Sequence, residues 1–155
     1  MRKLLAALTI VVCMCFTSAT PAAGVKAPKE LCLELNGSAN SVYCLAVKSL
    51  GSVKFADKQK LQHYTISGTY GMSDTHYPIG GTGYMDNNFF RFHISGQYQF
   101  GNAVHRSAEG YINLAIEPAV GSVTEVYSSS GAPVTQYTST LLKVPCSFVY
   151  APDDF

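Results

Sequence analysis

The stretch Phe89–Phe100 reads FFRFHISGQYQF and alternates apolar with polar side chains over almost its whole length. One set of alternate positions is apolar or small: Phe90, Phe92, Ile94, Gly96, Tyr98 and Phe100. Successive side chains of a β-strand point to opposite faces of the sheet, so this period of two predicts a strand with one buried and one solvated face. The stretch therefore predicts an antiparallel sheet whose apolar face must be covered.

The same pattern recurs on both sides of this stretch. From residue 24 onward, no long segment has helical periodicity. Further strands are predicted at residues 31–35, 42–47, 53–55, 61–70, 78–85, 104–114, 122–127, 134–140 and 141–150. Short, turn-rich links between them are typical of a single antiparallel meander. We expect an all-β domain over residues 31–150, closed into a small calycin-like barrel of about eight strands, because closure removes exposed sheet edges. A sandwich of two sheets fits the same pattern. Residues 24–30 form a flexible lead-in and residues 151–155 a tail in this interpretation.

The turn that follows Phe89–Phe100 decides which side chains meet across the next strand pair. A two-residue turn would set apolar residues opposite polar ones, whereas a three-residue turn sets Phe92 opposite Ile112 and His93 opposite Tyr111. We predict the second register. It gathers the ionisable residues of the two strands in a polar-face cluster: Arg91, His93, Glu109 and Tyr111. This cluster is a candidate ligand site or acid–base group, and a solvent-facing ladder of side chains is the plain alternative.

The apolar face of the strands is the second candidate site. Its aromatic and branched side chains would line the interior of a closed barrel: Tyr64, Ile66, Tyr70, Phe90, Phe92, Tyr98, Phe100 and Ile112. A barrel of about eight strands is wide enough either to be filled by its own side chains or to hold one small ligand. The face is therefore predicted to be either packed core or the lining of a site for a small apolar molecule.

The first 23 residues are typical of a secretory signal peptide. Arg2 and Lys3 precede an apolar run of about 13 residues, and small residues between Ala19 and Ala23 provide a cleavage site. The run is too short to cross a bilayer as a helix, which takes about 20 apolar residues. We therefore expect a secreted or periplasmic mature protein.

After cleavage three cysteines remain, and export permits a disulfide between two of them. Folding the chain at Ser38 sets Cys32 directly opposite Cys44, and the Cα atoms of opposed residues lie within the range that a disulfide accepts. The sequence therefore predicts a Cys32–Cys44 bridge, with Cys146 as the alternative partner of either cysteine.

Charge and motifs narrow the function only to broad classes. The chain carries 11 Lys and Arg against 10 Asp and Glu, so loss of Arg2 and Lys3 leaves a charge of about −1 and no basic stripe for nucleic acid. No cofactor fingerprint or metal-ligand spacing is present, so neither a cofactor nor a metal is expected. We predict a binding or interaction protein for a small apolar molecule or an envelope or extracellular partner. An eight-stranded outer-membrane barrel and an enzyme built around His93 are the alternatives.

Overall fold

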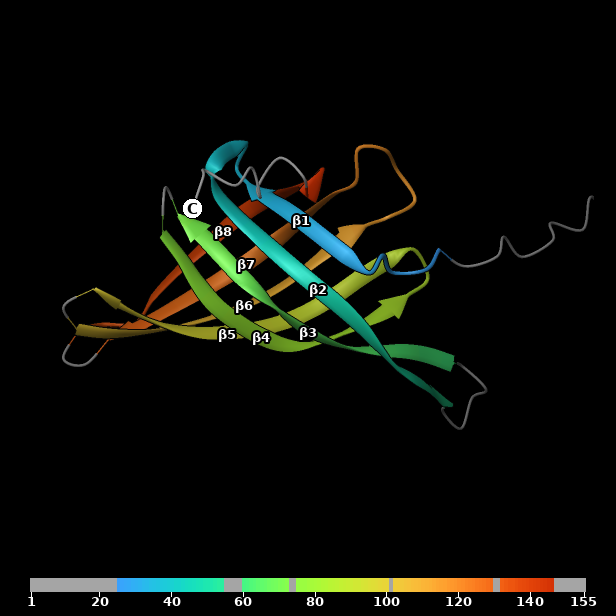
Figure 1. Cartoon of the computed structure of the whole chain (residues 1–155), viewed down its shortest axis with the longest axis horizontal. Helices are drawn as coiled ribbons and strands as arrows, with labels where there is room; N and C mark the ends of the chain where they lie inside the picture. The colour runs from blue at the N-terminus through green and yellow to red at the C-terminus, as the bar shows by residue number, and fades with distance from the viewer. Residues whose placement is uncertain (1–24, 55–59, 73–74, 101, 130–131, 147–155) are drawn as a thin grey trace, which may run out of the picture.

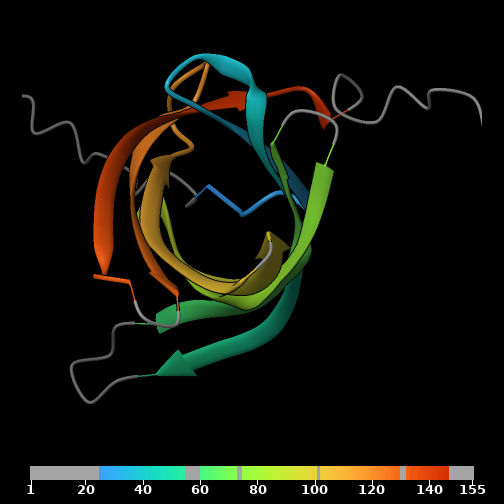
Figure 2. The same ribbon diagram turned by 90° about the vertical axis from the view of Figure 1, so that its left-hand side faces the viewer.

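The computed structural model describes residues 25–54, 60–72, 75–100, 102–129 and 132–146. They form the strands β1 (Glu30–Leu35), β2 (Ser38–Lys54), β3 (Lys60–Met72), β4 (Thr75–Asp86), β5 (Phe89–Phe100), β6 (Asn102–Asn113), β7 (Val120–Ser129) and β8 (Thr135–Val144). Each strand pairs antiparallel with the next, and β1 pairs with β8, so the meander closes into a barrel (Figure 1, Figure 2). The predicted all-β barrel is confirmed, and the two-sheet sandwich is wrong.

Several of the predicted strands are parts of longer ones. The predicted strand 42–47 and residues 53 and 54 of the predicted strand 53–55 belong to β2, which continues beside β3 as a two-stranded arm outside the ring of strands (Figure 2). Leu50 and Val53 in this arm are 63% and 50% exposed. The signal peptide and the tail lie outside the described residues. In the lead-in, Ala27 packs against the core and the Lys29 carbonyl accepts a hydrogen bond from the backbone of β2.

The barrel interior is one cluster of buried side chains to which all eight strands contribute. Phe92 and Ile112 are 4% and 0% exposed, and both belong to this cluster. Their neighbours His93 and Tyr111 are exposed on the outer wall. The assignment of apolar residues to the inside and polar residues to the outside, which the alternation predicts, is therefore confirmed for these four residues, whereas Arg106 of β6 is a charged residue on the inside.

The first hairpin turns at Asn36 and Gly37, both of which have positive φ, at 51° and 69°. An Asn-Gly pair with positive φ at both positions is the usual two-residue hairpin turn, because its twist matches that of the strands. The turn is shorter than the five-residue link in the predicted hairpin. The predicted register survives, since Leu31 lies opposite Leu45 and Leu33 opposite Tyr43.

The register of β5 against β6 differs from the predicted one by two residues. Phe92 lies opposite Gly110 instead of Ile112, and His93 lies opposite Glu109 instead of Tyr111. A shift of two residues leaves every side chain on its own face, so burial alone does not distinguish the two registers. Packing does, because a Cβ atom on Gly110 would lie 2.7 Å from the Cζ atom of Phe92. The bulky ring of Phe92 requires a glycine opposite.

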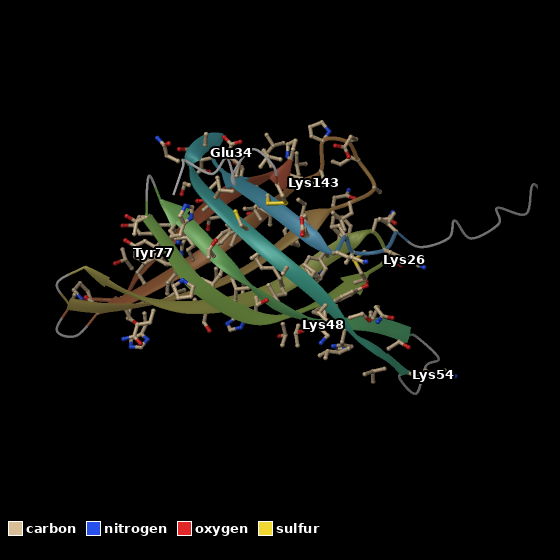
Figure 3. All side chains as sticks on the ribbon, viewed as in Figure 1. Lys26, Glu34, Lys48, Lys54, Tyr77 and Lys143 are labelled. Atoms are coloured by element: carbon tan, nitrogen blue, oxygen red, sulfur yellow. A yellow bond between two sulfur atoms is a disulfide. The ribbon has the colours of Figure 1, made fainter. Side chains whose placement is uncertain are left out.

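The predicted Cys32–Cys44 disulfide is wrong, because Cys32 is bonded to Cys146. The register behind the prediction is correct, since Cys32 does lie opposite Cys44. On its other edge, however, β1 pairs with β8, whose last residue Val144 lies opposite Cys32. This brings the Cα atom of Cys146 to 5.2 Å from that of Cys32, with Cys44 buried in the same cluster (Figure 3, near Lys143).

The seam between β1 and β8 is the shortest pairing in the barrel, with four residue pairs. Asn36 extends it beyond the strand. The Asn36 backbone N–H donates to the Thr140 carbonyl at 3.0 Å, and its side-chain carbonyl accepts from the Thr140 N–H at 2.9 Å. The Asn36 amide also donates to the Ser139 hydroxyl at 3.0 Å. The disulfide and Asn36 thus reinforce the seam where the barrel closes.

Gly81 in β4 lies where a close approach to β5 excludes a side chain. An added Cβ would be 2.0 Å from the carbonyl oxygen of His93 and 2.8 Å from the Cα atom of Ile94. At neighbouring Gly80 the nearest atom would be 3.6 Å away, which is ordinary contact. We expect Gly81→Ala to lower the free energy of unfolding by about 1–3 kcal/mol and Gly80→Ala to change it by less than about 0.5 kcal/mol. Urea unfolding followed by circular dichroism measures both, and equal effects would contradict the close packing of β4 on β5.

Candidate binding site on the outer wall

The polar-face cluster lies on the outer wall of the barrel, where it helps to line a cavity of about 470 Å³. β5 and β6 place Arg91 opposite Tyr111 and His93 opposite Glu109. The neighbouring strands β4 and β7 complete this outer-wall cavity, which is lined by Thr82, Tyr84, Arg91, Phe92, His93, Glu109, Gly110, Tyr111 and Thr124. The structure therefore brings all four predicted residues into one cavity, although the predicted cross-strand pairs between them were wrong.

Small residues beneath the outer-wall cavity explain why the wall can curve there. Phe92 lies between Gly83 of β4 and Gly110 of β6 in the two ladders. A Cβ atom at either glycine would lie within 2.8 Å of an aromatic ring and of a carbonyl oxygen of a neighbouring strand, so neither position has room for a side chain. Glycines at such positions let a sheet coil tightly. The sequence therefore favours a concave wall over Phe92.

Arg91 is held in place at the edge of the outer-wall cavity. Its Nε atom lies 3.3 Å from an oxygen of Asp86, and its Cζ atom lies 5.7 Å and 6.0 Å from the ring centroids of Tyr111 and Phe89. The Phe89 and Tyr111 rings meet edge to face, with centroids 5.8 Å apart. Ion pairing and cation–π contact at partly exposed sites each contribute about 0.5–1 kcal/mol. The guanidinium and the Tyr111 ring are therefore arranged before any ligand arrives.

His93 and Glu109 supply complementary hydrogen-bonding groups in the middle of the outer-wall cavity. The two residues face each other across β5 and β6, and both are exposed. The ion pairs among the described residues are formed by other side chains. An ionised carboxylate only accepts hydrogen bonds, whereas a neutral imidazole donates one and accepts one. The pair can therefore bind a hydroxyl or an amide of a ligand from two sides.

Most of the residues predicted to line a ligand site inside the barrel are buried in its core. Six of them belong to the buried interior cluster: Tyr64, Ile66, Tyr70, Phe90, Phe92 and Ile112. The Phe90 ring meets the Tyr64 ring edge to face at 5.7 Å between centroids and lies 6.3 Å from the Phe92 ring. The side chains of Tyr98 and Phe100 lie outside the described residues. A cavity for an apolar ligand among these residues stays a prediction.

The interior also holds a charged pair that sequence reasoning missed. Arg106 and Glu125 are 2% and 3% exposed, and their side chains form an ion pair. The Tyr43 hydroxyl donates to the same carboxylate, and the Cζ atom of Arg106 lies 3.5 Å from the ring centroid of Tyr70. A signal existed, because counting back in twos from the buried Ile112 along β6 reaches Arg106 on the inward face.

Comparison with known proteins and structures identifies no relative of this chain. No family model, no curated protein and no solved structure matches the chain. Among the described residues, no group of three or more His, Cys, Asp or Glu is placed to hold a metal ion. The same residues contain no helix that is long and apolar enough to span a membrane.

Proposed function

We propose that this chain is an exported binding protein that takes a small polar molecule in the outer-wall cavity. The observation that carries the proposal is that one cavity of about 470 Å³ gathers polar and aromatic side chains from four neighbouring strands. Ligand sites in proteins typically have volumes of about 300–1,000 Å³ and a few convergent polar groups. Export is supported by the signal-like start of the sequence and by the disulfide, because disulfides persist in oxidising compartments.

The rigidity of the site supports a binding role. The lining residues lie on the paired strands β4, β5, β6 and β7, and Arg91 is fixed by Asp86 and two aromatic rings. Sites built on strands hold their side chains more precisely than sites on loops. A ligand therefore meets a preformed surface and loses little affinity to ordering of the protein.

The same geometry favours binding over catalysis. An acid–base histidine needs a group that orients its ring and a site from which water is largely excluded. His93 is exposed, and the residue opposite it, Glu109, is exposed as well. These features suit contacts with a ligand in water more than proton transfer within a closed site.

The distribution of apolar side chains favours a barrel whose outer wall is exposed to water over the outer-membrane alternative. Membrane barrels point apolar residues outward to lipid and enclose a polar interior. In this barrel the large apolar cluster lies in the interior, and the outer positions of the central strands include Thr65, Ser67, His93, Ser95 and Glu109. Such a wall would leave many polar groups in lipid without partners.

Ligand-observed NMR with a library of small polar compounds tests the proposal. We expect at least one compound to bind and Tyr111→Ala to weaken it about tenfold, which corresponds to about 1.4 kcal/mol. Tyr137→Ala is the matched control, because Tyr137 is 56% exposed on β8 and does not line the outer-wall cavity. If Tyr137→Ala weakened binding as much as Tyr111→Ala, or if no compound bound, the outer-wall cavity would not be the site.

A further inference from the structure

The charge and chemistry of the outer-wall cavity point to the class of its ligand. We propose that it binds a neutral saccharide of two or more rings, an inference that rests on the proposed function. The lining contains one cation, Arg91, and one anion, Glu109. An anionic ligand would lie against Glu109 and a cationic ligand against Arg91, and each unfavourable contact would offset the favourable one. A neutral ligand avoids both conflicts.

The hydrogen-bonding groups of the outer-wall cavity match a neutral group that both donates and accepts, and a hydroxyl does both at a single atom. The Arg91 guanidinium only donates and the Glu109 carboxylate only accepts, while the hydroxyls of Thr82, Tyr84, Tyr111 and Thr124 do both. A hydroxyl of the ligand donates to the carboxylate and accepts from the guanidinium or the His93 ring. An apolar ligand would cover these groups without bonding them, at a cost of about 1–3 kcal/mol for each polar group left without a partner.

Tyr111 supplies the contact for the apolar side of a sugar ring. Its side chain is 40% exposed, and its ring is fixed edge to face against Phe89. The face of an aromatic ring is electron-rich and attracts the C–H groups that line one side of a sugar ring. Because Arg91 lies 5.7 Å from the Tyr111 ring centroid, its guanidinium can donate to the hydroxyls at the edge of a sugar stacked there. A saccharide thus uses both its apolar face and its polar edge.

The extent of the outer-wall cavity sets the length of the ligand. Its lining reaches from Thr82 on β4 to Thr124 on β7 and therefore crosses four adjacent strands. Three inter-strand spacings of about 4.8 Å correspond to roughly 14 Å. This distance exceeds the width of a single sugar ring, so the geometry favours two or three linked rings lying across the strands.

Calorimetric titration of the full-length mature protein with trisaccharides tests the inference. The neutral trisaccharides are maltotriose, cellotriose and N-acetylchitotriose. The acidic one is trigalacturonate, and the basic one is the chitosan trimer. We expect at least one neutral trisaccharide to bind, with an affinity that changes less than about twofold between 0.05 and 0.5 M salt, because no net charge is neutralised. Tyr111→Ala and Glu109→Gln should each weaken it about tenfold. Glu117→Gln is the matched control, since its side chain is 82% exposed and outside the outer-wall cavity.

The outcomes separate this inference from the proposed function. Binding of only the acidic or basic trisaccharide, with a strong salt dependence, would overturn the neutral class and leave the outer-wall cavity as a binding site. If no trisaccharide bound while a compound of another class bound in a Tyr111-dependent way, the saccharide would be wrong and the proposed function would stand. If nothing bound to the outer-wall cavity, both would fall.

Discussion

Glu125→Leu is expected to lower the free energy of unfolding by about 3–5 kcal/mol, because it leaves the Arg106 cation buried without its anion. Arg106 is 2% exposed, and its ion pair with Glu125 is the only one in the described interior that compensates its charge. The Arg106–Tyr70 contact is present with or without Glu125, so it does not replace the lost anion. The chain has no Trp, so urea unfolding is best followed by circular dichroism.

The double variant Arg106→Met with Glu125→Leu separates the cost of an unpaired charge from the cost of altered packing. It removes both charges, and we expect it to recover most of the stability, because apolar residues of similar volume often replace a buried ion pair at little cost. Glu109→Leu on the outer wall is the surface control and should change the free energy of unfolding by less than about 0.5 kcal/mol. Wild-type stability of the single variant Glu125→Leu would show that the pair is not a buried charge pair.

Loss of the Cys32–Cys146 disulfide is the second large effect. The bond closes a loop with a sequence separation of 114 residues and ties the end of β8 to β1 at the four-pair seam. Loop entropy for about 100 residues corresponds to about 4.7 kcal/mol, and measured losses are about 2–5 kcal/mol. We therefore expect the double variant Cys44→Ser with Cys146→Ser to unfold at much lower urea concentration than the single variant Cys44→Ser, in which the bond is retained.

The single variant Cys146→Ser tests the register between β1 and β2 at the same time. Cys32 and Cys44 are cross-strand partners, so under oxidising conditions we expect them to form a bond in this variant. The shorter loop would restore about 3 kcal/mol at most, which places its stability between those of the other two variants. Peptide mass mapping without reduction identifies the bond. Two alkylated cysteines in the unfolded variant would contradict the pairing of Cys32 with Cys44.

Alternation predicts the faces of the strands well because burial acts on every second residue. The sequence around Phe92 and Ile112 therefore predicted the all-β class, the inward position of Phe90, Phe92, Ile94 and Ile112, and the outward position of His93, Glu109 and Tyr111, and the structure has each of these. It did not predict the partners of β5 and β6, because a shift by two residues changes no face. The fit of the Phe92 ring against Gly110 favours the observed register.

Local sequence patterns could not predict the features that depend on closure of the barrel. The disulfide partner of Cys32 comes from β8 and is brought near only when the last strand pairs with the first. Arg106 and Glu125 lie at inward positions of the alternation. Charged residues are rarely buried unless they are paired, and this pair forms only when β6 lies beside β7. The depth of the outer-wall cavity likewise follows from the coiling of four strands, which no single stretch of sequence contains.

Methyl NMR during titration with a bound compound tests the central claim, that ligands contact the outer wall while the interior is packed core. Thr82 and Thr124 place methyl groups at the two ends of the outer-wall cavity, whereas Ile66, Ile94 and Ile112 place theirs in the interior. We predict that the threonine methyl signals shift with added ligand and that the isoleucine signals stay in place. Shifts of the isoleucine signals with unmoved threonine signals would put the ligand inside the barrel and contradict this account.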